Sequence, residues 1–194
     1  MIDQRNQIDE RLEQAKSLLE NSRLVEAEKH TEKILSDFPE NAEALYILAV
    51  CQRYLNRLEE ALETLSKLKK IRPGYGRAFQ EEGHVCVKAG FISQALNAYR
   101  HAVNLNNSLI ASWASLTKIL KSQGKEKNAN ITQHEYEKLK ALNFFRKNIK
   151  ETKEHNMIVD MERNDLSKIC MPGTVYIIKK KKVEEYKDLY HYVS

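Results

Sequence analysis

Residues 42–75 read AEALYILAVCQRYLNRLEEALETLSKLKKIRPGY, and this stretch decides the fold. Its apolar residues recur at three- and four-residue spacings, which predicts amphipathic helices. The first helix is expected over about Ala42–Leu55. Asn56 follows it and tolerates the left-handed backbone of a tight turn. A second helix then runs back and stops at Pro73, because proline cannot continue the helical hydrogen-bond ladder. The stretch therefore predicts a helical hairpin.

The same hairpin pattern recurs along the chain with a period of 34 residues. Four columns keep this spacing: Ser22, Asn56, Gly90 and Gly124; Ala27, Ala61, Ala95 and Ala129; Ala15, Ala49, Gly83 and Thr117; and Pro39, Pro73, Asn107 and Ala141. The first column suits a turn with positive φ. The second and third hold small residues where two helices approach closely. The fourth begins with prolines that end the second helix. A fixed period of this length indicates a repeat array.

The repeat pattern resembles the tetratricopeptide repeat family, whose pattern is W-x2-L-G-x2-Y followed by Ala, an aromatic residue and Pro. The fourth repeat carries Trp113 and Leu116 but has Thr117 for the glycine. The third carries Gly83, Ala95 and Tyr99 but has Asn107 for the proline. The resemblance covers about residues 8–141. It implies an all-α, right-handed superhelix of antiparallel helix pairs, whose function is to bind proteins.

We divide the chain on this basis into four repeats at about 8–41, 42–75, 76–109 and 110–141, a capping helix at 142–160 and a basic tail at 161–194. A narrower resemblance concerns Pro73–Leu116, which is similar to the repeats that precede a sulfotransferase domain in certain bacterial proteins. It implies an alternative function, the repeat module of a tetratricopeptide–sulfotransferase enzyme that lacks its catalytic domain. No glycine-rich phosphate loop follows a strand here.

Charge divides the chain unevenly. Residues 1–137 hold 19 Lys and Arg against 19 Asp and Glu, so the net charge of +5 comes from the C-terminal part. No apolar run is long enough to cross a bilayer, and no secretory signal is visible. A cytoplasmic location is expected. Cys51, Cys86 and Cys170 form no CxxC or zinc pattern, which indicates buried or partly buried free thiols.

The tail after Leu142 loses the repeat. Thr174–Ile178 is a β-type run, Lys179–Lys182 is a lysine run, and Val183, Tyr186, Tyr190 and Val193 are spaced as on a helix. Three interpretations remain open: a poorly ordered or loosely docked terminus, an aberrant end made by truncation or frameshift, and a basic peptide that contacts anionic lipid or nucleic acid through Lys179–Lys182.

The first helices of such an array line its concave face, which is the expected site for a protein or peptide partner. The predicted partner-binding residues on this face are Lys16, Tyr46, Arg53, Tyr54, Arg77, Gln80, His84, Lys88 and Lys118. Glu20, Glu43, Val50, Glu81 and Lys121 share the same phase. Tyrosine beside arginine is the composition of a binding hot spot. Arg53, Arg77 and His84 are expected to hold acidic or carbonyl groups.

Some tetratricopeptide arrays clamp the C-terminal carboxylate of chaperones. Here the corresponding positions hold Leu12, Lys16, Ile47, Arg77 and Glu81, so only Arg77 keeps the required charge. The chaperone clamp is therefore disfavoured. The six histidines lack a metal-ligand spacing, and Gly74-Tyr75-Gly76 lacks the strand and third glycine of a dinucleotide loop. The sequence thus predicts no enzyme activity, no cofactor and no metal, and no nucleic acid partner for the repeats.

Overall fold

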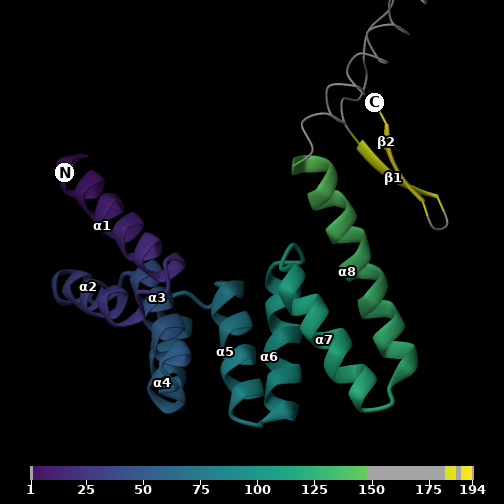
Figure 1. Ribbon diagram of the computed structural model, residues 1–194, viewed down its shortest axis with the longest axis horizontal. Coiled ribbons are helices and arrows are strands. Elements are labelled where there is room, and N and C mark those ends of the chain that lie inside the picture. Colours follow the sequence, from purple (N-terminus) through teal and green to yellow (C-terminus); the bar gives the residue numbers. More distant parts are fainter. Residues whose placement is uncertain (1, 148–181, 187–188, 194) are drawn as a thin grey trace, which may run out of the picture. The chain divides into compact units, whose positions relative to one another are not determined.

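The computed structural model of this chain describes residues 2–147, 182–186 and 189–193. Its helices are α1 (Ile2–Glu20), α2 (Leu24–Asp37), α3 (Ala42–Tyr54), α4 (Leu58–Ile71), α5 (Gly76–Lys88), α6 (Ile92–Leu105), α7 (Ile110–Ser122) and α8 (Glu126–Lys147). Helices α1 to α7 pack against their neighbours in chain order and alternate in direction (Figure 1). The predicted all-α fold of antiparallel helix pairs is confirmed for the repeats.

The chain divides into two compact units, Met1–Thr132 and Gln133–Ser194. The first unit contains α1 to α7 and the start of α8. The second contains the rest of α8 and a two-stranded hairpin, β1 (Lys182–Tyr186) and β2 (Leu189–Val193). All the predicted partner-binding residues belong to the first unit.

The turn inside each hairpin has the left-handed residue that the first column predicts. φ is +59° at Ser22, +66° at Asn56, +83° at Gly90 and +67° at Gly124. The next residue, such as Phe91, donates its N–H to a carbonyl in the last turn of the preceding helix, here Cys86 at 2.8 Å. This is the Schellman arrangement, which satisfies carbonyls that the helix end leaves unpaired. One turn chemistry, repeated at the same period, therefore sets the hairpin geometry.

The small-residue columns mark the close approaches between helices. Ala27, Ala61, Ala95 and Ala129 have no exposed surface. In the other column a Cβ atom added at Gly83 would lie 2.6 Å from the Tyr99 ring, so only glycine fits there. The burial of the alanines and the contact between Gly83 and the Tyr99 ring agree with the prediction that these positions are small.

The core is a series of clusters, each shared by neighbouring hairpins. One joins α1, α2 and α3, a second joins α3, α4 and α5, and a third joins α5, α6, α7 and the first turns of α8. Leu12, Ile34 and Ile47 represent the first, Leu45, Leu65 and Val85 the second, and Tyr99, Leu116 and Ala129 the third. Each repeat therefore depends on its neighbour to bury its apolar face, as expected for a solenoid.

The predicted burial of Cys51 and Cys86 as free thiols is also confirmed. Burial raises the pKa of the Cys51 thiol to about 12, so this thiol is protonated at neutral pH. Cys170 lies outside the described residues.

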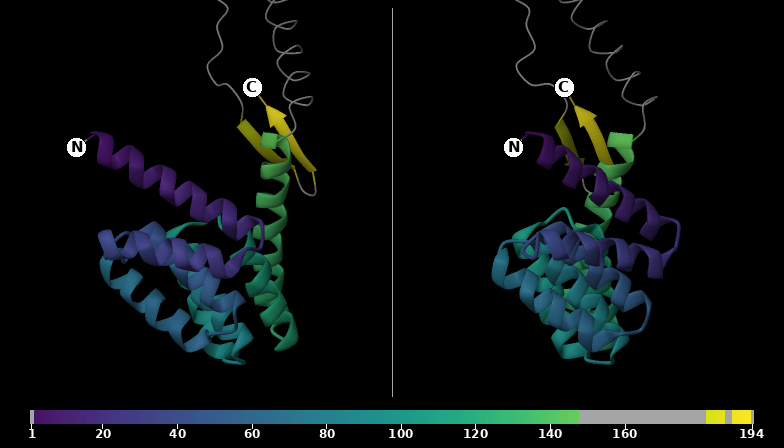
Figure 2. Two further views of the ribbon diagram at one scale, coloured as in Figure 1. Left: turned by 60° about the vertical axis from the view of Figure 1, so that its left-hand side comes forward. Right: turned by 90° about the vertical axis from the view of Figure 1, so that its left-hand side faces the viewer.

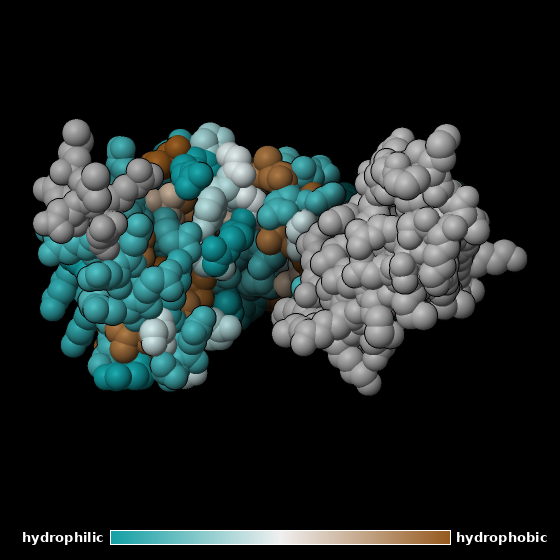
Figure 3. All heavy atoms as spheres, turned by 90° about the horizontal axis from the view of Figure 1, so that it is seen from above, coloured by the Kyte–Doolittle hydropathy of each residue, from teal (hydrophilic) through white to brown (hydrophobic). Residues whose placement is uncertain are grey.

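The coloured part of the face seen in Figure 3 is mostly hydrophilic and carries small hydrophobic patches, which suits amphipathic helices that turn their polar sides outward.

The C-terminal part differs from the helical spacing predicted for Val183–Val193, and that prediction was wrong. β1 and β2 pair antiparallel, with Val183 opposite Tyr192 and Tyr186 opposite Leu189. Valine and tyrosine, which make up much of this segment, favour a pleated strand over a helix. Thr174–Ile178 and the lysines before Lys182 lie outside the described residues.

The predicted capping segment 142–160 begins inside α8, which continues without a break to Lys147. Its residues after 147 lie outside the described part of the chain. Whether this segment covers the end of the array therefore stays a prediction.

Candidate functional site

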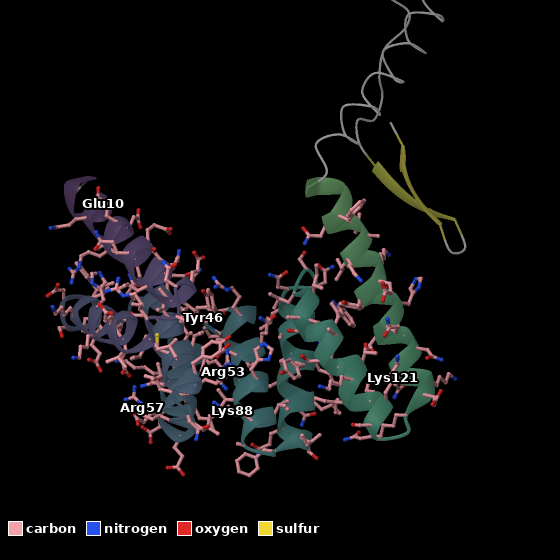
Figure 4. The ribbon with its side chains drawn as sticks, viewed as in Figure 1. Glu10, Tyr46, Arg53, Arg57, Lys88 and Lys121 are labelled. Carbon is pink, nitrogen blue, oxygen red and sulfur yellow. The ribbon has the colours of Figure 1, made fainter. Side chains whose placement is uncertain are left out.

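The nine predicted partner-binding residues lie on the first helix of each hairpin, namely on α1, α3, α5 and α7. We call the surface that they occupy the first-helix face. Tyr54, Arg77, Lys88 and Lys118 are exposed on it, while Lys16, Tyr46, Arg53, Gln80 and His84 are half-buried. Tyr46, Arg53 and Lys88 follow one another down α3 and α5 in Figure 4.

The charged groups around Glu43 on this face pair with one another. The carboxylate lies 3.2 Å from Arg77 and 3.5 Å from Lys16, and it accepts a 2.5 Å hydrogen bond from the Tyr75 hydroxyl. The Arg77 guanidinium also lies over the Tyr46 ring, 4.1 Å from its centroid. Burial alone would raise the pKa of the Glu43 carboxyl, but Tyr75 and the two cations bring it below its ordinary value. Glu43 is therefore ionised and already balanced.

Arg53 pairs with Glu81 across α3 and α5. Glu81 was placed on the face by its phase, but the structure buries it to 2 % exposure beneath the arginine. Val50 is buried as well, at 6 %. Burial by itself would lower the pKa of the Arg53 guanidinium, and the hydrogen bond from Arg53 to Glu81 more than offsets this, so the pKa is raised. The buried carboxylate thus fixes the arginine, whose guanidinium carbon lies 4.1 Å from the Tyr54 ring centroid.

His84 is held from below by Tyr99 of α6. Its Nδ1 lies 2.7 Å from the Tyr99 hydroxyl, and the two rings meet edge to face with centroids 5.4 Å apart. Burial lowers the pKa of His84 below its ordinary 6.5, so the imidazole is neutral at physiological pH. Burial also raises the pKa of Tyr99, to about 12. This pair is a neutral hydrogen-bonding platform and not a charge.

A pocket of about 560 Å³ opens beside this platform. It is lined by Arg53, His84, Val87, Lys88, Ile92, Tyr99, Ser115, Lys118, Ile119 and Ser122. Val87, Ile92 and Ile119 supply apolar wall, and none of the ten lining residues is acidic. The Lys88 ammonium donates to the Arg53 carbonyl at 2.8 Å, which holds its side chain across α3 and α5.

The structure therefore brings together one group of the predicted residues and separates it from the other. Arg53, His84, Lys88 and Lys118 share the pocket, whereas Lys16, Tyr46 and Arg77 belong to the Glu43 network. Gln80 accepts a 3.0 Å hydrogen bond from Ser112 of α7. Arg53 and Arg77, which were expected to hold acidic groups of a partner, instead pair with Glu81 and Glu43 of the same chain.

Sequence reasoning missed the contribution of the second helices. Tyr99 and Ile92 belong to α6, a second helix that the predicted face did not include, yet both line the pocket. The signal was available in the third column, because Gly83 leaves room for Tyr99, which follows Ala95 by one turn. Among the described residues, no group of three His, Cys, Asp or Glu side chains could hold a metal ion. None of the described helices is long and apolar enough to span a membrane.

Comparison with known proteins agrees with this architecture. Residues 11–81 match the sequence model of the tetratricopeptide repeat. The structure is similar to that of MamA, with a TM-score of 0.62 and 18 % identity over 70 % of this chain and 80 % of that one. A tetratricopeptide protein of Thermus thermophilus gives a TM-score of 0.61 and 22 % identity, covering 68 % and 74 %. The hairpin array has the fold of these solved structures, and its residues 11–81 are similar to the tetratricopeptide repeat.

The C-terminal segment matches a different kind of protein. Residues 129–194 match the model of the chorismate binding enzymes. Anthranilate synthase component 1 of Buchnera aphidicola subsp. Rhopalosiphum maidis is 49 % identical over 49 residues, which are 25 % of this chain and 10 % of that protein. The same component of Saccharolobus solfataricus is 49 % identical over 45 residues, covering 23 % and 11 %. The chain spans about a tenth of the length of these relatives.

Proposed function

We propose that the repeat array is a protein-interaction scaffold or adaptor, and that an extended peptide segment of a partner binds along its first-helix face. The observation that carries this proposal is the pocket lined by His84, Lys88 and Lys118, which lies on that face and has apolar walls. A concave, mostly apolar pocket with a few polar groups is the usual form of a binding site. Tyr54, 55 % exposed, adds an aromatic surface nearby.

The groups on the face suit binding more than chemistry, so we propose that the array itself is not catalytic. His84 is committed to Tyr99, and the Glu43 and Glu81 carboxylates are committed to arginines. A general base or nucleophile needs a partner arrangement that leaves it available to a substrate. The charged groups here instead fix the face and leave Lys118 and Tyr54 at its surface.

The test is selection of a random peptide library on the full chain. Peptides that bind the wild type should lose at least about tenfold in affinity for the double variant Tyr54→Ala/Lys118→Ala, the effect of about 1.4 kcal/mol. The matched control is Lys29→Ala/Lys67→Ala, which removes two exposed lysines from α2 and α4. Selected peptides that bind both double variants as tightly as the wild type would place the binding surface elsewhere.

The C-terminal segment favours a second candidate function. We propose that residues 129–194, which match the chorismate binding enzymes, carry a role in chorismate binding. Titration calorimetry of the full chain with chorismate should show saturable heat below about 1 mM, the upper end of typical KM values. Citrate, a carboxylate without the chorismate ring, is the control ligand. Heat that does not saturate, or equal heat with citrate, counts against this candidate.

Three expectations from the sequence are proposals as well. The alternative of a sulfotransferase repeat module would be favoured by a neighbouring reading frame with a nucleotide-binding loop. The lysine run at 179–182 would be assigned to anionic lipid or nucleic acid by binding that falls steeply with salt and disappears when residues 174–194 are deleted. We also propose a cytoplasmic location, because the free thiols Cys51 and Cys86 would persist in a reducing compartment.

A further inference from the structure

Among the described residues, the cations of the first-helix face fall into two groups, one paired with carboxylates and one at the pocket. At Glu43 and Glu81 the cations Lys16, Arg77 and Arg53 face carboxylates of the same chain. A further anion there would have to displace an existing ion pair. For Arg53 and the buried Glu81 this is costly, because the carboxylate is left without compensation. The Glu43 pairs are more exposed and would be displaced at a lower cost. The N-terminal part of the face is therefore a poor site for an acidic ligand.

The pocket between α5, α6 and α7 is different. Lys88 and Lys118 line it, both are exposed, and its described lining contains no carboxylate. Lys88 is oriented by the Arg53 carbonyl, which leaves its other two N–H groups able to donate, since an ammonium has three. For Lys118 the described residues provide no ion pair. Two ammonium groups at one pocket will attract an anion, and the attraction is stronger beside apolar walls than in open water.

The apolar side chains that line the pocket indicate that a ligand needs apolar groups beside its anionic group. Val87 and Ile92 are 41 % and 37 % exposed, which is high for large apolar side chains, and Ile119 closes the same pocket. An apolar side chain of a ligand would cover this surface and remove it from water. The neutral His84–Tyr99 pair can hydrogen-bond to a ligand but adds no charge.

We propose that this pocket binds an acidic side chain flanked by large apolar side chains, within a peptide segment that runs along the first-helix face. Lys118 and Lys88 bind the carboxylate, and Val87, Ile92 and Ile119 contact the apolar neighbours. The carboxylate belongs to a side chain and not to a chain terminus, because the face continues past the pocket along α3 and α1, so a segment can pass through it. This inference rests on the proposed function and names the ligand class of the same site.

The experiment uses the full chain and fluorescein-labelled short peptides blocked at both ends, read by anisotropy. The probe has a central Leu-Glu-Leu in a Gly/Ser background. The matched peptides carry Leu-Gln-Leu or Ser-Glu-Ser, and a further Leu-Gln-Leu peptide has a free C-terminal carboxylate. The probe should bind about tenfold tighter than each blocked control, because a hydrogen bond to a charged group and the apolar contact each contribute on that scale.

Lys118→Ala should reduce probe affinity about tenfold and Lys118→Arg should largely restore it, while Lys67→Ala on α4 should leave it unchanged. Equal affinity for the Glu and Gln peptides, or no effect of Lys118→Ala, would overturn the proposal. So would tight binding of the free-acid peptide alone, which would assign the pocket to a chain terminus. Library peptides that bind this face without an acidic residue would overturn this inference and leave the proposed function standing.

Discussion

Replacement of Gly83 by alanine is predicted to destabilise the array, although alanine is the better helix former. The added Cβ would lie 2.6, 2.7 and 2.8 Å from three atoms of the Tyr99 ring. Carbon atoms in contact are normally about 3.5–4.0 Å apart, so ring and helix would have to separate by about 1 Å. Tyr99 cannot simply rotate away, because it is 1 % exposed and its hydroxyl is bound to His84 at 2.7 Å.

The magnitude is a difference of two effects. Overpacking a dense core costs about 1–3 kcal/mol, and this site is at the upper end because the neighbour is a fixed ring. Glycine to alanine in a helix interior returns about 1 kcal/mol. The free energy of unfolding should therefore fall by about 2 kcal/mol. With a urea dependence of about 2 kcal/mol per molar, the unfolding midpoint should fall by about 1 M.

The assay is urea unfolding followed by far-UV circular dichroism on the full chain. Gly74→Ala is the control, since a Cβ there meets nothing within 4 Å and the midpoint should stay the same. Adding Tyr99→Leu to Gly83→Ala should show favourable coupling between the two sites, because the smaller side chain accepts the new methyl group. A Gly83→Ala midpoint equal to or above that of the wild type would refute the explanation by close helix approach.

Three other features of the array can be tested in the same way. Arg53→Ala leaves the Glu81 carboxylate buried and unpaired, so the free energy of unfolding should fall by about 3 kcal/mol. The double change Arg53→Met/Glu81→Leu removes both charges and should lower the free energy of unfolding much less. Chemical denaturation of both variants measures the two losses, and equal losses would contradict this explanation. Ser22→Gly, at φ +59°, should stabilise the protein by about 1 kcal/mol. Ser36→Gly, in the last turn of α2, should instead destabilise it by no more than about 0.5 kcal/mol. Thermal melts that move in the same direction for both variants would argue against backbone strain at the turn. Burial lowers the pKa of His84 below 6.5, so the unfolded chain binds the proton more readily than the folded chain does, and stability should fall as the pH drops below about 6.5. His84→Gln should flatten this part of a profile of the urea midpoint between about pH 8 and 5. An unchanged profile would exclude His84 as the source of the pH dependence.

Most of the fold could be predicted from the sequence because its period is tied to backbone geometry. A residue with positive φ is needed at each hairpin turn, so Asn56, Gly90 and Gly124 stand out by type and by spacing, whereas Ser22 stands out by spacing alone. The column of alanines at 27, 61, 95 and 129 is equally easy to recognise in the sequence, because only a small side chain fits at these fully buried positions. These constraints act locally and repeat, so each copy supports the others.

The site was less predictable because it depends on side-chain pairing between helices. The phase of α3 and α5 places both Arg53 and Glu81 toward the face, but phase does not show that they bind each other and that Glu81 becomes buried. Periodicity also treats Tyr99 as a core residue of α6, whereas its hydroxyl reaches His84 at the pocket. Which charges remain available to a ligand is therefore a property of the packed structure.

The C-terminal segment shows the opposite limit. It lacks the 34-residue period, so repeat spacing gives no information there, and a helical spacing was assigned to residues that form β1 and β2. Its resemblance to chorismate binding enzymes lies in residue identities and not in periodicity. Comparison with other sequences was needed to find it.

Hydrogen–deuterium exchange on the intact chain, with and without a peptide selected from the library, tests the central claim most directly. If the first-helix face is the docking surface, bound peptide should slow exchange in α3, α5 and α7, most strongly in Val85–Lys88 and Ser115–Ile119 around the pocket. Protection confined to α2, α4 and α6 would contradict the account, because the partner would then bind the opposite helices.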